Sequence, residues 1–208
     1  MTYIVIIIGS VFLLYVVSKI VIDNRNKKLL LSVTSLDRGT SSEKDLILKL
    51  LKNKIPSKAI FHDLMITKGE NDFSQIDLVL ATKQGLIVFE VKDYKGWIFG
   101  TGNHNNWTQV LAYGKRKYRF YNPVKQNKNH INNLKNTLKQ FDEIPFYSIV
   151  VFYGDCTLKE IEYIPKDTYI VKPYRIMEVL NQIKNNNESA PYSNKQEIVD
   201  ELNKAVIL

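Results

Sequence analysis

The stretch that decides the fold is residues 86–92, which read Leu-Ile-Val-Phe-Glu-Val-Lys. Its first four residues are apolar on both faces of an extended chain, which is typical of a covered central strand. Because successive side chains of a strand alternate, Glu90 and Lys92 project from the same face. A carboxylate and an ammonium group are costly to bury unless each has a partner. The stretch therefore predicts a central strand that ends in a polar site.

A second acidic residue is expected beside the end of this strand. The run 75–82 precedes it, and Lys83-Gln84-Gly85 joins the two runs as a tight hairpin in which Gly85 supplies a positive φ. Asp77 lies among apolar residues near the start of the first run. A tight hairpin brings the start of one strand beside the end of the next, so Asp77 is predicted to lie near Glu90 and Lys92.

Two carboxylates beside a lysine are suited to metal-assisted hydrolysis. Asp77 and Glu90 can hold a hard divalent cation such as Mg²⁺, and Lys92 can position or help deprotonate an attacking water. The alternative is an ion pair of Lys92 with Glu90 or Asp77 at the edge of the sheet. Glu43 has its own alternative, because Thr40-Ser41-Ser42-Glu43 matches a helix capping box. Glu43 can do both jobs only if the helix start faces the site.

The rest of the chain predicts an α/β fold with a mixed central sheet flanked by helices. The capping box opens a helix with apolar residues at helical spacing, and Pro56 closes it. The other predicted strands are 59–66, 107–113, 117–121, 146–153 and 169–171. The other predicted helices are 124–141, 173–185 and a last one that Asn194 caps and that ends near Ala205.

The N-terminal residues 1–22 are predicted to form one transmembrane anchor. From Tyr3 to Ile22 only Gly9, Ser10, Ser18 and Lys19 interrupt apolar or aromatic side chains. A helix of this length spans roughly 30 Å of hydrocarbon. A buried core helix is the alternative, but it would usually show a polar stripe. Residues 23–37 are expected to be a charged juxtamembrane linker.

The basic residues after the apolar run predict the topology of the anchor. Lys27 and Lys28 lie on its C-terminal flank and nothing basic precedes it, so the N-terminus is expected outside and the following domain in the cytoplasm. Cys156 is the single cysteine, which fits a reducing compartment. We therefore expect a single-pass protein of the cell membrane.

Composition and charge narrow the class of partner. The 208 residues are 45% hydrophobic and 24% charged, which excludes a disordered or collagen-like chain. The net charge of +8 favours a polyanion. Between Tyr94 and Phe141 there are nine Lys or Arg, no Asp or Glu, and several interleaved aromatic residues. This pattern favours nucleic acid, with anionic lipid as the main alternative. The candidate nucleic-acid-binding residues are Lys95, Lys115, Arg116, Lys117, Arg119, Lys125 and Lys128.

Other common sites lack their motifs. The chain has no Gly-x-x-x-x-Gly-Lys-Ser/Thr phosphate-binding loop. His62, His104 and His130 lack the spacing of zinc ligands, and each is expected to be a satisfied or exposed histidine.

Several short motifs occur in an order that is specific in combination. The motif Gly-x-x-Gly-Glu appears as residues 39–43, with Ser42 in place of the second glycine, and Gln-x-Asp is residues 75–77. Glu-x-Lys is residues 90–92, and Trp107 is followed by Asn122-Pro123-Val124-Lys125-Gln126 with His130 four residues on. With these motifs, residues 38–153 resemble the nuclease-related domain (NERD) family, which is assigned to the PD-(D/E)xK nuclease fold.

The resemblance implies a restriction-endonuclease-like fold and a metal-dependent nuclease acting on DNA. Asp77, Glu90 and the carbonyl of Val91 would ligate Mg²⁺ or Mn²⁺, and Lys92 would orient the water. Glu43 would add a carboxylate, and Gln126 would position a phosphate or the water. The nuclease domain is expected at 38–155, with 156–208 packing on it. The alternative function is a non-catalytic module that keeps the fold and binds nucleic acid, or a membrane scaffold.

Overall fold

The strand β3 (Leu86–Asp93) is the middle strand of a five-stranded sheet in the computed structural model, which describes residues 2–67, 72–139, 143–191 and 195–205. On one side lie β2 (Phe73–Ala81) and β1 (Ile60–Thr67), and both pairings are antiparallel. On the other side β7 (Phe146–Tyr153) and β9 (Thr168–Val171) run parallel to it. The first five residues of β3 are buried, which confirms the predicted covered central strand.

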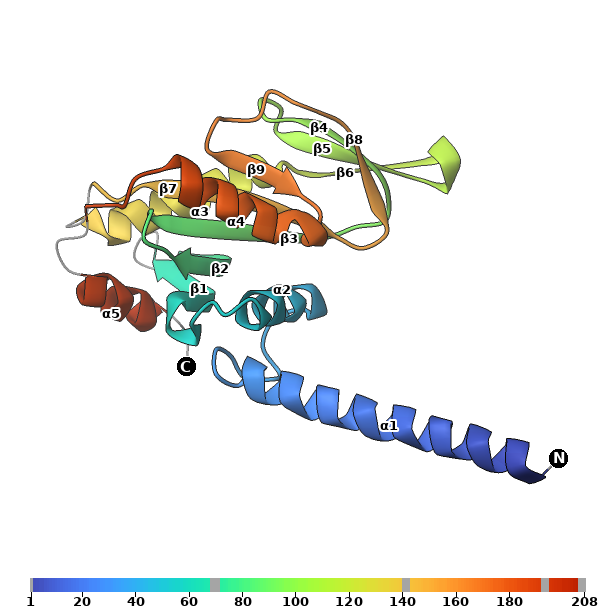
Figure 1. The fold of residues 1–208 in the computed structure, drawn as a ribbon. Coiled ribbons are helices and arrows are strands. Elements are labelled where there is room, and N and C mark those ends of the chain that lie inside the picture. Colours follow the sequence, from blue (N-terminus) through green and yellow to red (C-terminus); the bar gives the residue numbers. More distant parts are fainter. Residues whose placement is uncertain (1, 68–71, 140–142, 192–194, 206–208) are drawn as a thin grey trace.

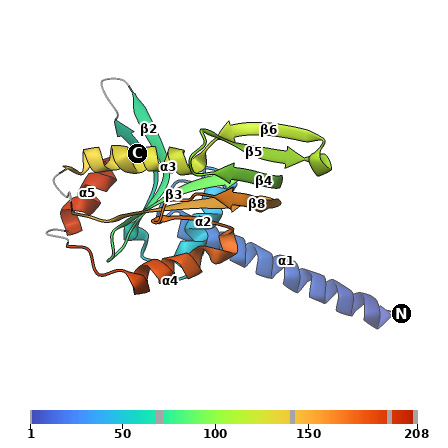
Figure 2. The same ribbon diagram turned by 90° about the horizontal axis from the view of Figure 1, so that it is seen from above.

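Helices cover both faces of this sheet (Figure 2). On one face α2 (Ser41–Lys52) and α4 (Ile176–Asn186) contribute apolar side chains to a core shared with β2, β3 and β7. On the other, α3 (Pro123–Thr137) and α5 (Lys195–Ala205) pack over β1, β2 and β3. Fully burying one such aliphatic side chain contributes about 1.5–3 kcal/mol. The predicted α/β architecture with flanking helices is therefore confirmed.

A second, four-stranded sheet packs beside the first. Its order is β6 (Arg116–Tyr121), β5 (Asn106–Leu111), β4 (Gly96–Thr101) and β8 (Cys156–Glu162). Trp107 joins the two sheets, since its ring is fully buried and stacks on Phe152 with centroids 5.9 Å apart. The strands β4 and β8 were not predicted, because both are short and neither alternates cleanly between apolar and polar residues.

Several predicted boundaries were wrong. The strand expected over 107–113 ends at Leu111, because a 3₁₀ turn, η2 (Ala112–Gly114), follows it with φ of 50° at Ala112. α3 ends at Thr137 rather than 141. The helix expected from Pro173 begins as the 3₁₀ turn η4 (Pro173–Arg175), and another such turn, η1 (Ser57–Ala59), precedes β1. The expected cap Asn194 lies outside the described residues.

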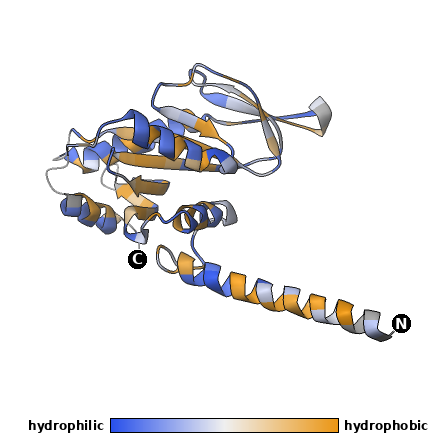
Figure 3. Ribbon diagram, in the orientation of Figure 1, coloured by the Kyte–Doolittle hydropathy of each residue, from blue (hydrophilic) through white to orange (hydrophobic). Residues whose placement is uncertain are grey.

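The N-terminal helix α1 (Thr2–Leu30) extends away from the sheets (Figure 1). It continues past residue 22, so the first part of the expected linker is helical. The segment Ile7–Leu30 is long and apolar enough to cross a membrane, and its most apolar stretch has a mean hydropathy of 1.7 and contains no buried residue (Figure 3). At its end Leu30 is 7% exposed and packs into the core beside α2. The helix is thus joined directly to the domain.

Candidate active site

The pairing of β2 with β3 brings Asp77 to the end of the central strand. Leu78 lies opposite Phe89 in the antiparallel register. One residue further along, the Asp77 Oδ2 atom accepts a hydrogen bond from the Val91 backbone N–H at 2.7 Å. Asp77 is half-buried. The hairpin prediction that Asp77 lies beside this end of β3 is confirmed.

Glu90 and Lys92 form an ion pair on β3. The Lys92 Nζ atom lies 2.6 Å from Glu90 Oε1, and the side chains are 20% and 1% exposed. The same Nζ donates to Gln126 Oε1 on α3 at 3.1 Å. The sequence offered such a pair as the alternative to a metal site, but at the edge of the sheet. The structure has it on the middle strand, where burial raises the cost of each uncompensated charge.

A histidine on α3 faces the other oxygen of Glu90. His130 Nε2 lies 3.3 Å from Glu90 Oε2, yet within the described part of the chain neither atom makes a hydrogen bond. His130 Nδ1 is 2.8 Å from Ser74 Oγ, which fixes the ring. Glu90 Oε2 is therefore a buried acceptor with spare capacity.

Sequence reasoning missed the contact between His130 and Glu90. It expected only a satisfied or exposed histidine, although the spacing of four residues from Gln126 places both side chains on one helix face. That spacing was the available signal, because Gln126 was already a candidate residue.

Glu43 is held at the start of α2 by three contacts with two side chains, those of Thr40 and His62. Thr40 Oγ1 accepts from the Glu43 backbone N–H at 3.3 Å and donates to Glu43 Oε1 at 2.7 Å. Glu43 Oε2 lies 3.1 Å from His62 Nε2. Burial raises the pKa of Glu43, and the hydrogen bonds with His62 and Thr40 lower it more, so that the net pKa is lowered. Glu43 is therefore held as a carboxylate at a helix start.

Gly39 leaves the space that this arrangement needs. Its φ is +70°, and a Cβ atom there would lie 2.5 Å from His62 Nε2 and 2.7 Å from Glu43 Oε2. Only glycine adopts this backbone readily with so little space.

Ser42, which replaces the second glycine of the motif, ties α2 to the end of β3. Its Oγ donates to Asp93 Oδ2 at 2.6 Å, and Ser42 is 6% exposed. The replacement therefore holds the helix start against the strand that carries Glu90 and Lys92.

The pKa of Asp77 is raised at this end of the sheet by burial and by the neighbouring negative charges. Burial, followed by the charge of Glu90, raises the pKa of Asp77 to about 7, although the Val91 N–H opposes the shift. The charge of Glu43 contributes in the same direction, so the start of α2 faces the site. A divalent cation would relieve this repulsion, since hard cations prefer carboxylate oxygens.

The donor set fits Mg²⁺ or Mn²⁺ as an open site. Asp77 and Glu90 offer two carboxylates, and Glu90 Oε2 accepts no hydrogen bond from any residue that the structure describes. Over the described ranges, no group of three or more His, Cys, Asp or Glu side chains is arranged to hold a metal ion. Main-chain and water oxygens would complete the coordination, as is usual for Mg²⁺.

Some of the candidate nucleic-acid-binding residues lie near the start of α3, and others lie at the tip of the β5–β6 hairpin. Lys125 Nζ donates to Asn105 Oδ1 at 2.7 Å, one residue from Gln126. Asn105 borders a polar hollow of about 550 Å³ that also includes Arg119. Lys95 and Lys128 are exposed. Lys115, Arg116 and Lys117 lie at or next to the tip of the β5–β6 hairpin, which stands out from the sheets (Figure 1).

Comparison with known proteins identifies the family. Residues 38–153 match the model of the nuclease-related domain, whose general kind is the PD-(D/E)xK nuclease superfamily. An uncharacterized protein of Bacillus anthracis is 29% identical over 136 residues, which cover 64% of this chain and 61% of that protein. The match thus spans less than two thirds of the length of this relative. No solved structure matches this chain. The chain belongs to the nuclease-related domain family.

Proposed function

We propose that the chain is a membrane-anchored, metal-dependent endodeoxyribonuclease that hydrolyses DNA phosphodiester bonds. The observation that carries this proposal is the convergence of Asp77, Glu90 and Lys92 at one end of the central strand. Membership of the nuclease-related domain family suggests the same class of reaction. A module that only binds DNA has no need of two carboxylates placed so that the charge of Glu90 raises the pKa of Asp77.

Asp77, Glu90 and the Val91 carbonyl would hold Mg²⁺ or Mn²⁺. When bound, such an ion stabilises negative charge on a phosphate oxygen and lowers the pKa of a coordinated water. The spare Oε2 atom of Glu90 and the raised pKa of Asp77 support this assignment.

Lys92 and Gln126 would position the reacting groups. Lys92 Nζ donates to Gln126 Oε1 and pairs with Glu90, so its ammonium group is held at a fixed place beside both carboxylates. There it would hold the attacking water or a phosphate oxygen and offset developing negative charge. Gln126 orients Lys92, and Glu43 adds a third negative charge from α2.

The DNA backbone would cross the start of α3. Lys125 lies next to Gln126 and reaches the polar hollow that contains Arg119. Lys95 follows β3 directly, and Lys128 is exposed one turn further along α3. These four cations would track phosphates that lead to the site.

The helix α1 would anchor the enzyme in the cell membrane. Its length and hydropathy support a single span, and Lys27 and Lys28 in its last turn support a cytoplasmic position of the domain, with the N-terminus outside.

One observation favours the non-catalytic alternative. Glu90 Oε1 is already paired with Lys92 at 2.6 Å, so the site is partly neutralised by the chain itself. A module that binds nucleic acid without cutting it would keep this pair for stability alone.

The test is plasmid cleavage by the purified full chain in detergent, with Mg²⁺, with Mn²⁺ and with a chelator. The variants are Asp77→Asn, Glu90→Gln and the matched control Glu143→Gln. Glu143 is exposed and lies close in sequence to Pro145, whose carbonyl accepts from Leu86 at the opposite end of β3. Metal-dependent conversion of supercoiled to open-circular DNA is expected for the wild type and the control only. Equal cutting by Asp77→Asn would refute the assignment, and DNA binding without cutting by the wild type would favour the alternative.

A further inference from the structure

The β5–β6 hairpin ends in an exposed, uniformly basic tip. Lys115, Arg116 and Lys117 are all exposed, and a Cβ atom at Gly114 would meet no other atom within 4 Å. No Asp or Glu occurs between Tyr94 and Phe141. The acidic residues of β8 lie at the other edge of the sheet, because the strand order is β6-β5-β4-β8. The tip therefore presents positive charge without local compensation.

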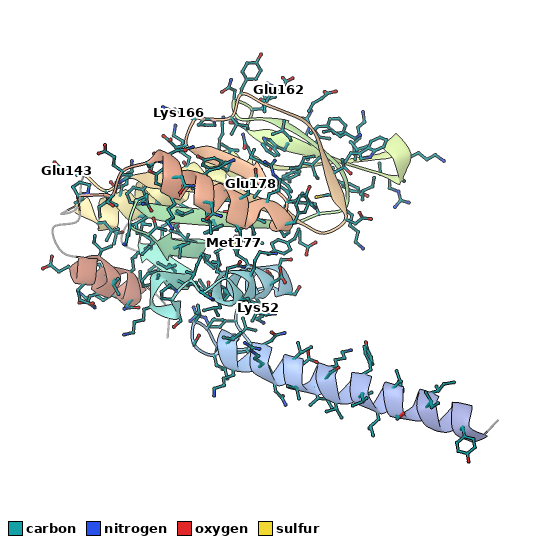
Figure 4. The ribbon with its side chains drawn as sticks, viewed as in Figure 1. Lys52, Glu143, Glu162, Lys166, Met177 and Glu178 are labelled. Carbon is teal, nitrogen blue, oxygen red and sulfur yellow. The ribbon has the colours of Figure 1, made fainter. Side chains whose placement is uncertain are left out.

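The tip is remote from the acidic residues that Figure 4 labels. Glu143, Glu162 and Glu178 all lie well away from the end of the hairpin in that view. A surface that served only as a solvated face would mix charges of both signs, as the rest of the chain does. The tip instead has the character of a contact for a polyanion.

The direction of the tip distinguishes between the two polyanions that the sequence allowed. In Figures 1 and 2 the hairpin tip and the N-terminal end of α1 extend beyond the sheets on the same side. The apolar part of α1 is exposed along its length. If that part lies in a bilayer, the hairpin tip points toward the surface of the same bilayer.

The junction between α1 and the domain keeps this direction fixed. Leu30 is buried in the core beside α2. Just beyond it, Thr34 Oγ1 lies 2.9 Å from His62 Nδ1, and Arg38 Nη2 donates to Asp63 Oδ2 at 2.8 Å. A flexible linker would let the domain turn freely, but this segment is tied to β1 at two points.

We infer that the hairpin tip at residues 115–117 rests on the anionic lipid surface of the membrane in which α1 is anchored. The inference rests on the anchoring proposed above and adds a second contact that fixes how the domain faces the bilayer. Three cations would favour docking on an anionic leaflet over docking on a neutral leaflet by roughly 100-fold. The cations near Gln126 remain for DNA.

The test places an environment-sensitive fluorophore on the tip of the full chain in vesicles. Ala112→Cys gives an exposed attachment point, whereas Cys156 is buried. The wild-type chain, treated with the same fluorophore in parallel, measures any reaction at Cys156. Asn186→Cys, exposed at the end of α4, carries the control label. Vesicles contain phosphatidylcholine alone or mixed with phosphatidylglycerol.

A blue shift of the tip label is expected in anionic vesicles only, and it should fall with added salt because screening shortens the reach of the charges. The combined Lys115→Glu, Arg116→Glu and Lys117→Glu variant should lose the shift. The matched combination Lys139→Glu, Lys166→Glu and Lys184→Glu, which changes the net charge equally, should keep it; all three of its lysines are exposed.

The outcomes separate this inference from the proposals on which it depends. Protein that floats with the vesicles but shows the same tip signal in neutral and anionic lipid overturns the docking contact alone. A tip response to duplex DNA and none to anionic lipid overturns it in favour of nucleic acid. Protein that does not float with vesicles overturns the anchoring as well, whereas loss of plasmid cleavage affects only the nuclease proposal.

Discussion

Replacing Lys92 by methionine tests the electrostatic core of the site in the absence of metal. The substitution keeps most of the apolar stem but removes the charge that lies 2.6 Å from Glu90 Oε1. Glu90 is 1% exposed, so among the described residues its carboxylate would keep the contact with His130 alone. Breaking a buried ion pair by removing one partner costs about 3–5 kcal/mol. Because the Lys92 side chain is 20% exposed, the lower end, about 3 kcal/mol, is expected.

The assay is urea unfolding of the full chain in a mild detergent with a chelator, followed by tryptophan fluorescence. Trp107 is fully buried and reports on the contact between the two sheets. A double-mutant cycle with Glu90→Gln isolates the pair. Glu90→Gln leaves a lysine that can reach solvent, so it should cost about 1 kcal/mol, and the double variant should be more stable than Lys92→Met alone.

Adding Mg²⁺ extends the same experiment to the metal. If a cation binds at Asp77 and Glu90, it replaces the lost positive charge, and ligand binding to the folded state raises its stability. Lys92→Met should therefore gain more from Mg²⁺ than the wild type does. A metal-free Lys92→Met variant within about 0.5 kcal/mol of the wild type, the range of ordinary surface substitutions, would refute the reasoning.

Three further predictions follow from the same contacts. The pKa of Asp77 is raised from 3.8 to about 7, so the folded state holds a proton that the unfolded state has lost. The metal-free chain should accordingly lose stability, by at most about 4 kcal/mol, as the pH rises from about 4 to about 7. Mg²⁺ affinity, measured by calorimetry, should rise over the same range, and an affinity independent of pH between 5 and 7 would contradict the shift. Ser42→Gly removes the hydrogen bond to Asp93 and should cost about 1–2 kcal/mol in urea unfolding, whereas an unchanged midpoint would show that the bond is not formed. Gly39→Ala should cost about 1–3 kcal/mol because its Cβ would meet His62 and Glu43 at φ +70°, and a neutral effect would mean that the loop relaxes.

Much of the main sheet was predictable because its signals are local. Residues 86–92 are apolar on both faces and predicted the central strand correctly. The hairpin at Gly85, which has a φ of +141°, placed Asp77 beside β3. Such arguments need only alternation and turn geometry, which neighbouring residues determine.

The second sheet was harder to predict because it depends on distant pairing. β4 pairs with β8 in parallel, and the two strands lie far apart in the sequence, so no hairpin signal joins them. Each is short, and neither alternates cleanly between apolar and polar residues. Ile98 of β4 and Cys156 of β8 are buried in one cluster with Trp107 and Phe152, a contact that tertiary structure alone reveals.

The site itself was predicted in composition but not in its internal contacts. The sequence suggested Asp77, Glu90 and Lys92, yet Glu90 and Lys92 each have a further partner on α3, where His130 and Gln126 face β3. Similarly, the extension of α1 to Leu30 depends on packing against α2. Charge patterns find candidate residues, but the packing of helices on the sheet decides which of them meet.

The most direct test of the account measures Mn²⁺ binding to the full chain and to its variants by electron paramagnetic resonance. The account predicts saturable binding that Asp77→Asn and Glu90→Gln each abolish and that the control Glu143→Gln leaves unchanged. Mn²⁺ binding that survives both Asp77→Asn and Glu90→Gln would contradict the claim that these two carboxylates form the metal centre.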